Sequence, residues 1–118
     1  MVCVVKINKT GKWNEEISLL VLGHLVADYV FQTDSIALGK NNTLDPAKFG
    51  VNWYYWMGSH AATHSLFVYG LTMNIWACLF EFVSHFVIDC MKCNKYYSLH
   101  VDQLLHIICK GTIVILII

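Results

Sequence analysis

The chain has 118 residues, which is enough for one domain. Its hydrophobic fraction is 57%, its charged fraction is only 14%, and eight Lys and Arg residues balance eight Asp and Glu residues to a net charge of zero. A soluble domain of this size carries more charge on its surface, and a nucleic-acid partner would call for a basic patch. The composition therefore argues against nucleic acid as a partner and predicts that much of the surface contacts lipid.

Four apolar segments follow one another and predict an all-α protein of one domain, residues 1–118. The predicted helices span about residues 13–38, 52–69, 73–94 and 98–118. Each has roughly 18–25 residues, the length that crosses a bilayer core of about 30 Å. We therefore predict a four-helix antiparallel transmembrane bundle.

Local signals mark the ends of these segments. Gly39 and the polar residues after it are typical of a helix stop, and a second break is expected near residues 70–74. Asp45 followed by Pro46 predicts the N-cap and first residue of a short extra turn. Ser98 is a suitable N-cap for the fourth helix.

Aromatic residues gather beside two of the predicted loops. One cluster, residues 53–56, opens the second helix, and Tyr96 and Tyr97 precede the fourth. In an antiparallel bundle the first and third loops lie at the same end. Both clusters would then share one membrane–water interface, where Trp and Tyr are enriched. Ordinary aromatic packing in a core is the alternative interpretation.

Every predicted helix carries one pair of metal-ligand residue types spaced four residues apart. The pairs are His24 with Asp28, His60 with His64, His85 with Asp89, and Asp102 with His106. Side chains at i and i+4 project from one helix face, about 5–6 Å apart at Cβ, so both members can reach one ion. A single histidine on an apolar helix is more often a satisfied core residue, but four separate pairs favour a shared site.

The depth of these pairs predicts a single cluster with metal as its cofactor. All eight side chains fall in the half of the bundle nearer the first and third loops, roughly 6–20 Å below that end at 1.5 Å per residue. Buried together, the ionised Asp28, Asp89 and Asp102 would repel one another unless cations neutralise them. We expect one or two divalent ions, with zinc preferred and iron or manganese as alternatives, because imidazole and carboxylate ligands suit these metals.

Other polar residues are candidates for catalysis or for orienting the ligands. Glu81 and Asp34 are the candidate catalytic residues, since an acidic group that is not a ligand can act as general base. Gln32 continues the face of the first pair, and Thr63 adjoins the second. His100 lies off the face of the fourth pair, so we expect it at the membrane interface.

Cys90 and Cys93 form an isolated CxxC motif. Such a pair supplies two of the four ligands of a zinc site or forms a redox couple. The alternative is that they are two polarisable residues at a helix end with no role in chemistry.

Taken together, the four blocks resemble a known family. They are residues 24–34, the pairs at 60–64 and 85–89, and residues 102–106. They are similar to the signature blocks of small bacterial and phage multi-pass membrane proteins catalogued as domain of unknown function 3307, over about residues 17–108. The step from Thr63 to Ser65, with its neighbouring His-x3-Asp pairs, is more distantly similar to inner-membrane proteins described as metal-dependent hydrolases. The resemblance implies a location in the cytoplasmic (inner) membrane.

These observations lead to several hypotheses of function. The first is a membrane-embedded, metal-dependent hydrolase that acts on a membrane lipid or lipid-linked phosphoester, with the metal activating water. The alternative is a non-catalytic, metal-stabilised module that binds another membrane protein. A further alternative is haem binding between facing histidines, although axial histidines need no carboxylate at i+4. A homo-oligomer is also expected because so much aromatic surface is exposed.

Overall fold

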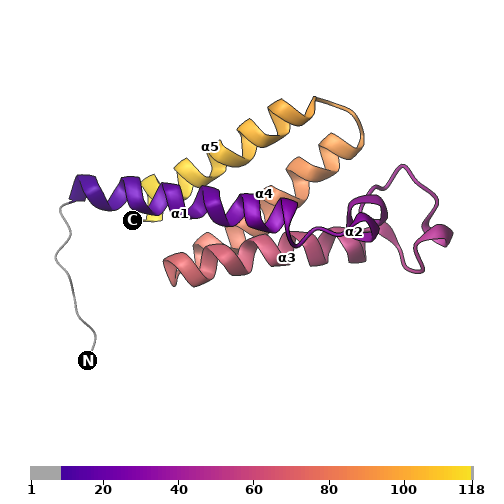
Figure 1. Cartoon of the computed structure of the whole chain (residues 1–118), viewed down its shortest axis with the longest axis horizontal. Helices are drawn as coiled ribbons and strands as arrows, with labels where there is room; N and C mark the ends of the chain where they lie inside the picture. The colour runs from indigo at the N-terminus through magenta and orange to yellow at the C-terminus, as the bar shows by residue number, and fades with distance from the viewer. Residues whose placement is uncertain (1–8, 118) are drawn as a thin grey trace.

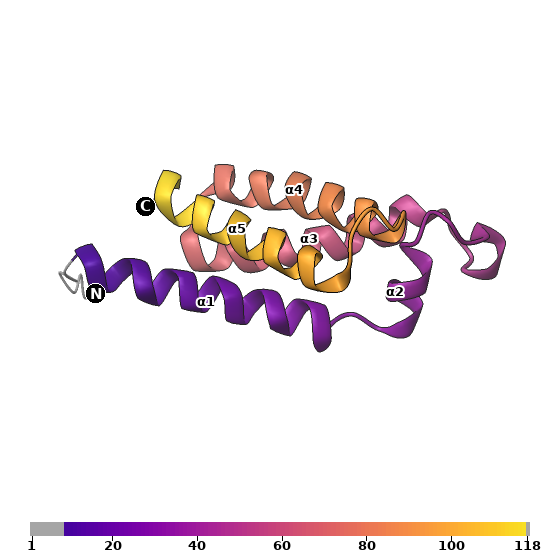
Figure 2. The ribbon, with the colours of Figure 1, turned by 90° about the horizontal axis from the view of Figure 1, so that it is seen from above.

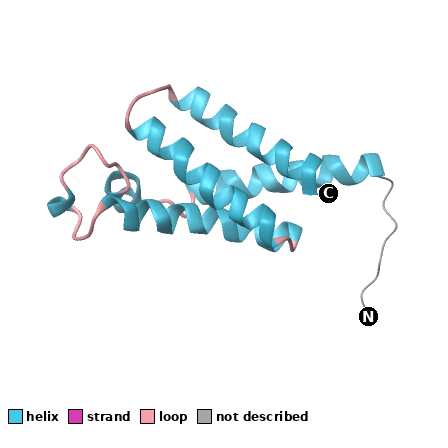
Figure 3. Cartoon of the chain, turned by 180° about the vertical axis from the view of Figure 1, so that it is seen from behind, coloured by secondary structure: helices cyan, strands magenta, loops and turns pink. Residues whose placement is uncertain are grey.

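The computed structural model describes residues 9–117, with side chains for residues 12–116. Within that part the chain is all-helical and has no strand (Figure 3). The elements are α1 (Lys9–Tyr29), α2 (Asp34–Gly39), the 3-10 helix η1 (Pro46–Lys48), α3 (Trp53–Thr72), α4 (Ile75–Cys93) and α5 (Leu99–Ile117). The predicted all-α class is confirmed. Residues 1–8 and 118 of the predicted domain lie outside the described part.

The four long helices pack as an antiparallel bundle. Helix α1 contacts α3 and α5, and α4 contacts the same two helices, so the four form a closed ring. Consecutive long helices run in opposite directions (Figures 1 and 2). The segment that carries α2 and the loop between α4 and α5 therefore lie at one end, the loop end. The turn between α3 and α4 lies at the other, the far end, with the start of α1 and the end of α5.

The prediction of one continuous helix over residues 13–38 is wrong. Helix α1 ends at Tyr29, and a separate short helix α2 begins at Asp34. The Thr33 side chain caps α2 by accepting a hydrogen bond from the N–H of Ile36 at 3.3 Å. Because the chain turns before this cap, Gln32 lies in the turn and does not continue the inner face of α1 as predicted.

The other predicted boundaries are close to those observed. Asp45 accepts the N–H two residues ahead at 3.0 Å and caps η1. Ser98 Oγ accepts the N–H three residues ahead at 3.4 Å, at the start of α5. Helix α3 ends with Met73 in the left-handed region at φ 51°, and Asn74 then caps α4 by accepting the N–H two residues ahead at 2.8 Å. The chain therefore reverses at the far end within two residues.

The interior of the bundle is polar and its exterior is apolar. Among the described residues, eight hydrophobic side chains are buried against eleven polar or charged ones, while thirty-two large hydrophobic residues are exposed. Soluble proteins show the opposite preference. One described helix, α5 over Leu99–Leu116, is long and apolar enough to cross a membrane. A core helix of a soluble protein can pass the same test of length and composition.

The largest buried apolar cluster lies toward the far end. It contains Leu20, Val68, Ala77, Ile113 and Val114, and Ile17 packs against it. Each member lies beyond the polar residues of its own helix when the helix is followed from the loop end. This apolar plug closes the bundle below the buried polar residues.

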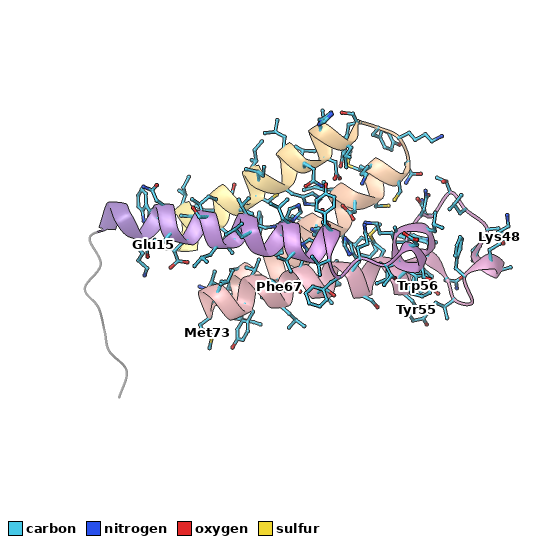
Figure 4. The ribbon with its side chains drawn as sticks, in the orientation of Figure 1. Glu15, Lys48, Tyr55, Trp56, Phe67 and Met73 are labelled. Carbon is cyan, nitrogen blue, oxygen red and sulfur yellow. The ribbon has the colours of Figure 1, made fainter. Side chains whose placement is uncertain are left out.

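Helix α2 is held at the loop end by a close contact with α3. A Cβ atom on Gly39 would lie 2.6 Å from Cδ1 of Trp56, so only glycine permits this approach. Trp56 lies beside α2 in Figure 4. The contact places the next residue, Lys40, where its side chain enters the bundle and is 5% exposed.

We expect Gly39→Ala to lower the free energy of unfolding by about 1–3 kcal/mol, because the added methyl overpacks against the indole. Gly58 in α3 is the matched control, since a Cβ there meets nothing within 4 Å. Gly58→Ala should be neutral or stabilising by up to about 1 kcal/mol, through helix propensity. Denaturant unfolding of the two variants in mild detergent measures both values. Equal effects would contradict the packing of α2 on α3.

Candidate metal centre

All four pairs predicted from the sequence form contacts across one helix turn. The separations are 3.3 Å for His24 Nε2 to Asp28 Oδ2, 3.6 Å for His85 Nε2 to Asp89 Oδ2, 3.6 Å for His106 Nε2 to Asp102 Oδ1, and 4.7 Å between the ring centroids of His60 and His64. The bundle then brings the four pairs together into one cluster.

The cluster is built in layers because the four-residue spacing continues along each helix. The layer nearest the loop end holds three carboxylates: Asp28, Asp89 and Asp102. The next layer holds one histidine from each long helix: His24, His64, His85 and His106. Glu81 and Lys110 form the third layer, above the apolar plug. Four chemically distinct layers thus follow one another from the loop end to the far end.

The histidine layer is a closed ring of contacts. The ring centroids are 3.7 Å apart for His64 and His85, 4.3 Å for His85 and His106, 4.8 Å for His106 and His24, and 4.9 Å for His24 and His64. Each of these four side chains is at most 3% exposed. His60 bridges the first two layers, since its Nε2 lies 3.3 Å from a carboxylate oxygen of both Asp28 and Asp89.

The carboxylates of Asp28 and Asp89 face the Nε2 atoms of the surrounding rings. The Nε2 of His64 lies 2.9 Å from Asp28 Oδ1, and the Nε2 of His106 lies 3.0 Å from Asp89 Oδ1. In the tautomer that carries its proton on Nε2, each imidazole donates a hydrogen bond to the carboxylate. The same nitrogen atoms would face a metal ion placed between the helices.

Lysines pair with three of the acidic residues, and the sequence analysis missed them. Lys40, the residue that follows α2, forms a buried ion pair with Asp89. Lys110 Nζ lies 2.5 Å from Glu81 Oε1, and Lys92 Nζ lies 3.9 Å from Asp102 Oδ2. Lys110 follows His106 by four residues, so its place on the inner face of α5 could have been found. Nothing in the sequence around Lys40 marks it as buried.

The charges inside the bundle do not cancel. Four carboxylates, those of Asp28, Glu81, Asp89 and Asp102, face two fully buried lysines, Lys40 and Lys110. Two negative charges are left, and the partly exposed Lys92 offsets at most one of them from 3.9 Å. An uncompensated buried charge costs several kcal/mol. The interior therefore favours an added positive charge of one to two.

His85 lies between two of these buried carboxylates, Glu81 and Asp89. Its Nδ1 lies 3.4 Å from Glu81 and its Nε2 lies 3.6 Å from Asp89, yet neither ring nitrogen makes a hydrogen bond, although the residue is fully buried. Three groups of ligand atoms lie within 4.8 Å of one another, and His85 belongs to each. They are His24, His64, Glu81 and His85; Asp28, His60, His64 and His85; and His85, Asp89 and His106.

The remaining predicted residues are placed differently. Glu81 is in the cluster, but Asp34 is exposed as the first residue of α2 and belongs to none of the three groups. Thr63 Oγ1 donates to the backbone oxygen of Ser59 at 3.0 Å and does not reach the cluster. His100 is exposed on α5, as expected for an interfacial residue.

The two cysteines of the CxxC motif also lie apart from the cluster. Cys90 and Cys93 are free, half-buried thiols in the last turn of α4. Neither belongs to a group of ligand atoms that could share an ion among the described residues. The prediction of a role for the motif stays untested.

The loop after α4 is anchored beside the cluster. The Tyr97 hydroxyl donates a hydrogen bond to the backbone oxygen of Ile88. Burial and the nearby Asp102 carboxylate together raise the pKa of Tyr97 to about 12. The phenol therefore stays protonated as a donor and holds the loop between α4 and α5 in place.

The fold and this centre define an all-helical protein with a buried histidine–carboxylate cluster. The chain belongs to the family described as "Protein of unknown function (DUF3307)", whose model matches residues 17–118. The predicted resemblance to this family is thereby confirmed, whereas the match does not bear on its predicted multi-pass membrane character. No curated protein and no solved structure matches the chain. These comparisons supply no activity and do not support the predicted likeness to metal-dependent hydrolases.

We expect Lys110→Met to lower the free energy of unfolding by about 3–5 kcal/mol, because it leaves the Glu81 charge buried and unpaired. The double variant Lys110→Met, Glu81→Leu should recover most of this loss, since replacing a whole buried pair is often neutral. Lys48→Met is the control at an exposed lysine. Unfolding in chelator and mild detergent measures all three; a double variant as unstable as the single one would show that the pair is not the cause.

Proposed function

We propose that this chain is an integral membrane protein that binds one divalent metal ion in its histidine–carboxylate centre and uses it to hydrolyse a membrane-associated phosphoester. The observation that carries the proposal is His85, a fully buried imidazole with no hydrogen bond at either nitrogen. Leaving such a polar group unpaired costs about 1–3 kcal/mol. A metal ion is the partner that would satisfy it and also balance the buried carboxylates.

The ligand atoms need only a small contraction to hold an ion. Zinc binds imidazole nitrogen and carboxylate oxygen at about 2.0–2.2 Å, so its ligand atoms lie at most about 4.4 Å from one another. Those of His85, Asp89 and His106 lie within 4.8 Å, which gives three protein ligands and leaves a fourth position for water. This group reaches the surface because Asp89 lines a pocket at the loop end, and it leaves Asp28, which lines the same pocket, free of the ion.

One ion fits the centre better than two. The three groups of ligand atoms all share His85, and two of them share His64 as well. A neutral imidazole normally ligates one ion, with its second nitrogen donating to a neighbouring group. The remaining one to two negative charges of the interior also match a single divalent cation. The two ions allowed by the sequence would compete for the same ligands.

The distribution of polarity supports a place in the membrane. Ionisable residues inside a membrane bundle face its interior and pair there, as the buried residues of this chain do. The predicted aromatic clusters lie at the same end, since α3 begins at the loop end and Tyr96 precedes α5. Tyr54, Tyr55 and Tyr96 are exposed there, as expected for residues at a membrane–water interface.

The protein groups at the pocket assign the roles in hydrolysis. A bound zinc ion supplies a water nucleophile at neutral pH and polarises the phosphoryl oxygens. Asp28 is the group best placed to take a proton from water, because its side chain is 10% exposed and lines the pocket. Glu81, which the sequence proposed as base, is held by Lys110 one layer deeper, and Asp34 lies outside the centre.

A non-catalytic module is the second candidate, favoured by the depth and pairing of the cluster. Each histidine of the cluster is at most 3% exposed. Lys40 and Lys110 already offset part of the negative charge of the carboxylates. A metal or protons on the histidines would then serve stability alone. Haem is not favoured, because His64 and His85 stack at 3.7 Å and leave no room for a porphyrin between them.

We expect protein purified without chelators to contain about one zinc, iron or manganese ion per chain by elemental analysis. His64→Ala and Asp89→Ala should weaken metal binding by at least about tenfold, since even outer partners of ligands contribute that much. His100→Ala and Asp34→Ala are the matched controls, because both residues are exposed. Wild-type protein that is purified without chelators, contains no metal and takes up none on dialysis against zinc would contradict the proposal.

We also expect phospholipid or phosphatidate turnover by the metal-loaded protein in vesicles. Chelation should abolish it, and Asp28→Asn should lower the rate by about 10²–10⁴-fold, the contribution typical of a general base. Phosphate release measures the rate, with Asp34→Asn as control. Equal turnover by His64→Ala and wild type would assign the activity to a contaminant, and full metal loading without turnover on any lipid phosphoester would favour the non-catalytic module.

A further inference from the structure

A small pocket opens at the loop end directly above the cluster. Its volume is about 70 Å³, room for about two water molecules or one small tetrahedral group. Its floor is formed by Asp28 and Asp89, and its walls include Lys40, Lys92, Gln32 and Gln103. The pocket therefore connects the proposed metal ligands with two cations and two amides.

The charge of this pocket depends on the metal. Asp28, Asp89 and the adjacent Asp102 outnumber Lys40 and Lys92, so these groups carry a net charge of minus one when the centre holds no ion. A divalent ion on the floor reverses that charge to plus one. Lys40 and a metal ion both need Asp89, whose Oδ2 also lies 3.3 Å from His60. When the ion takes that carboxylate, the Lys40 ammonium loses its partner and is left facing the pocket.

The walls offer further polar groups. The Lys92 side chain is 34% exposed and lies 3.9 Å from Asp102, so it is free to approach a bound anion. Gln103 Nε2 already donates to Asp28 and Asp102, at 3.1 and 3.2 Å. Gln32 Oε1 is buried with no hydrogen-bond partner. Rotating this amide by 180° turns its Nε2 into the same place, where it can donate to a phosphoryl oxygen.

Toward the far end, apolar residues of the described part of the chain close off the cluster. The apolar plug of Leu20, Val68, Ala77, Ile113 and Val114 fills the bundle toward the far end. Glu81 and Lys110 are paired directly above it. A ligand that enters through the loop-end pocket therefore passes Lys40 and Lys92 before it reaches the proposed metal ligands.

We propose that the pocket is a metal-dependent binding site for a phosphoryl group, held by Lys40 and Lys92. This deepens the proposed function and rests on it, since the net positive charge arises only with a bound ion. An anionic group with several oxygens matches the sign of that charge and the number of donors, and charge-assisted hydrogen bonds from lysine are the strongest contacts available to it. A lipid phosphomonoester headgroup and free phosphate share this chemistry.

The test uses full-length protein in phosphatidylcholine vesicles, either loaded with zinc and cleared of excess metal or stripped with chelator. Equilibrium dialysis with radiolabelled inorganic phosphate measures binding. We expect one phosphate per zinc-loaded chain and at least about tenfold weaker binding without zinc, the effect of losing one charged contact. Lys92→Gln should also weaken binding about tenfold, and Lys92→Arg should restore most of it.

Two further variants separate the pocket from general charge. Lys48→Gln removes the same charge from η1, where Figure 4 places Lys48 at the tip of the loop segment, and should leave phosphate binding unchanged. Gln32→Leu changes no charge and should weaken binding a few-fold. Vesicles that contain phosphatidic acid complete the design: competition with phosphate identifies the lipid headgroup as the ligand, and its absence identifies free phosphate. Either result supports a phosphoryl site.

Metal content, measured on each variant, separates the two proposals. If zinc stays at one per chain and phosphate does not bind, or binds Lys92→Gln as tightly as wild type, the phosphoryl site is wrong and the metal centre stands. Phosphate binding of equal strength with and without zinc also overturns the site. If the wild type holds no metal, the proposed function fails and this inference fails with it.

Discussion

The carboxylates of Asp28 and Asp89 are removed from water at the centre of the bundle, and the packing of the other elements follows from that cost. A buried carboxylate costs several kcal/mol unless donors and positive charge surround it. No single helix can supply enough of them, because its own face offers only the residue four positions away. Asp28 of α1 therefore depends on histidines of α3, and Asp89 of α4 depends on His106 of α5 and on Lys40, which follows α2. The polar network fixes which helices are neighbours and how deep each is set.

This dependence explains which features could be predicted from the sequence. The four pairs of histidine and aspartate residues could be predicted, because a spacing of four residues defines a helix face without any knowledge of tertiary structure. Their common depth also could, since it needs only the helix rise and the positions of two loops. The break after Tyr29 and the burial of Lys40 could not. Both depend on the approach of α2 to Trp56 through Gly39, a contact between segments that no local pattern encodes.

The same polar network also explains why the exterior of the bundle is apolar. Because histidines, carboxylates and lysines fill the inner faces, the large apolar residues of the long helices are left on the outside. Water would penalise that arrangement, whereas lipid accepts it and raises the cost of any polar group that is not turned inward. The buried ionisable residues and the apolar exterior thus have one origin: each long helix turns its polar face inward and its apolar face outward. The inner polar residues also lower the mean hydropathy of each long helix, and among the described helices only α5 passes the test of length and composition for a membrane span.

The order of the layers argues for chemistry reached from one end rather than for passage through the bundle. A conducting path needs polar groups, water or a moving element at both ends. Here the polar layers begin at a pocket lined by Lys40 and Lys92, pass through the histidine ring and end at the pair of Glu81 and Lys110. Beyond that pair the buried cluster is aliphatic. A charge that enters from the loop end meets increasing burial and then an apolar plug, so it is held near the histidines and carboxylates. That geometry suits a site that binds a ligand and releases a product on the same side.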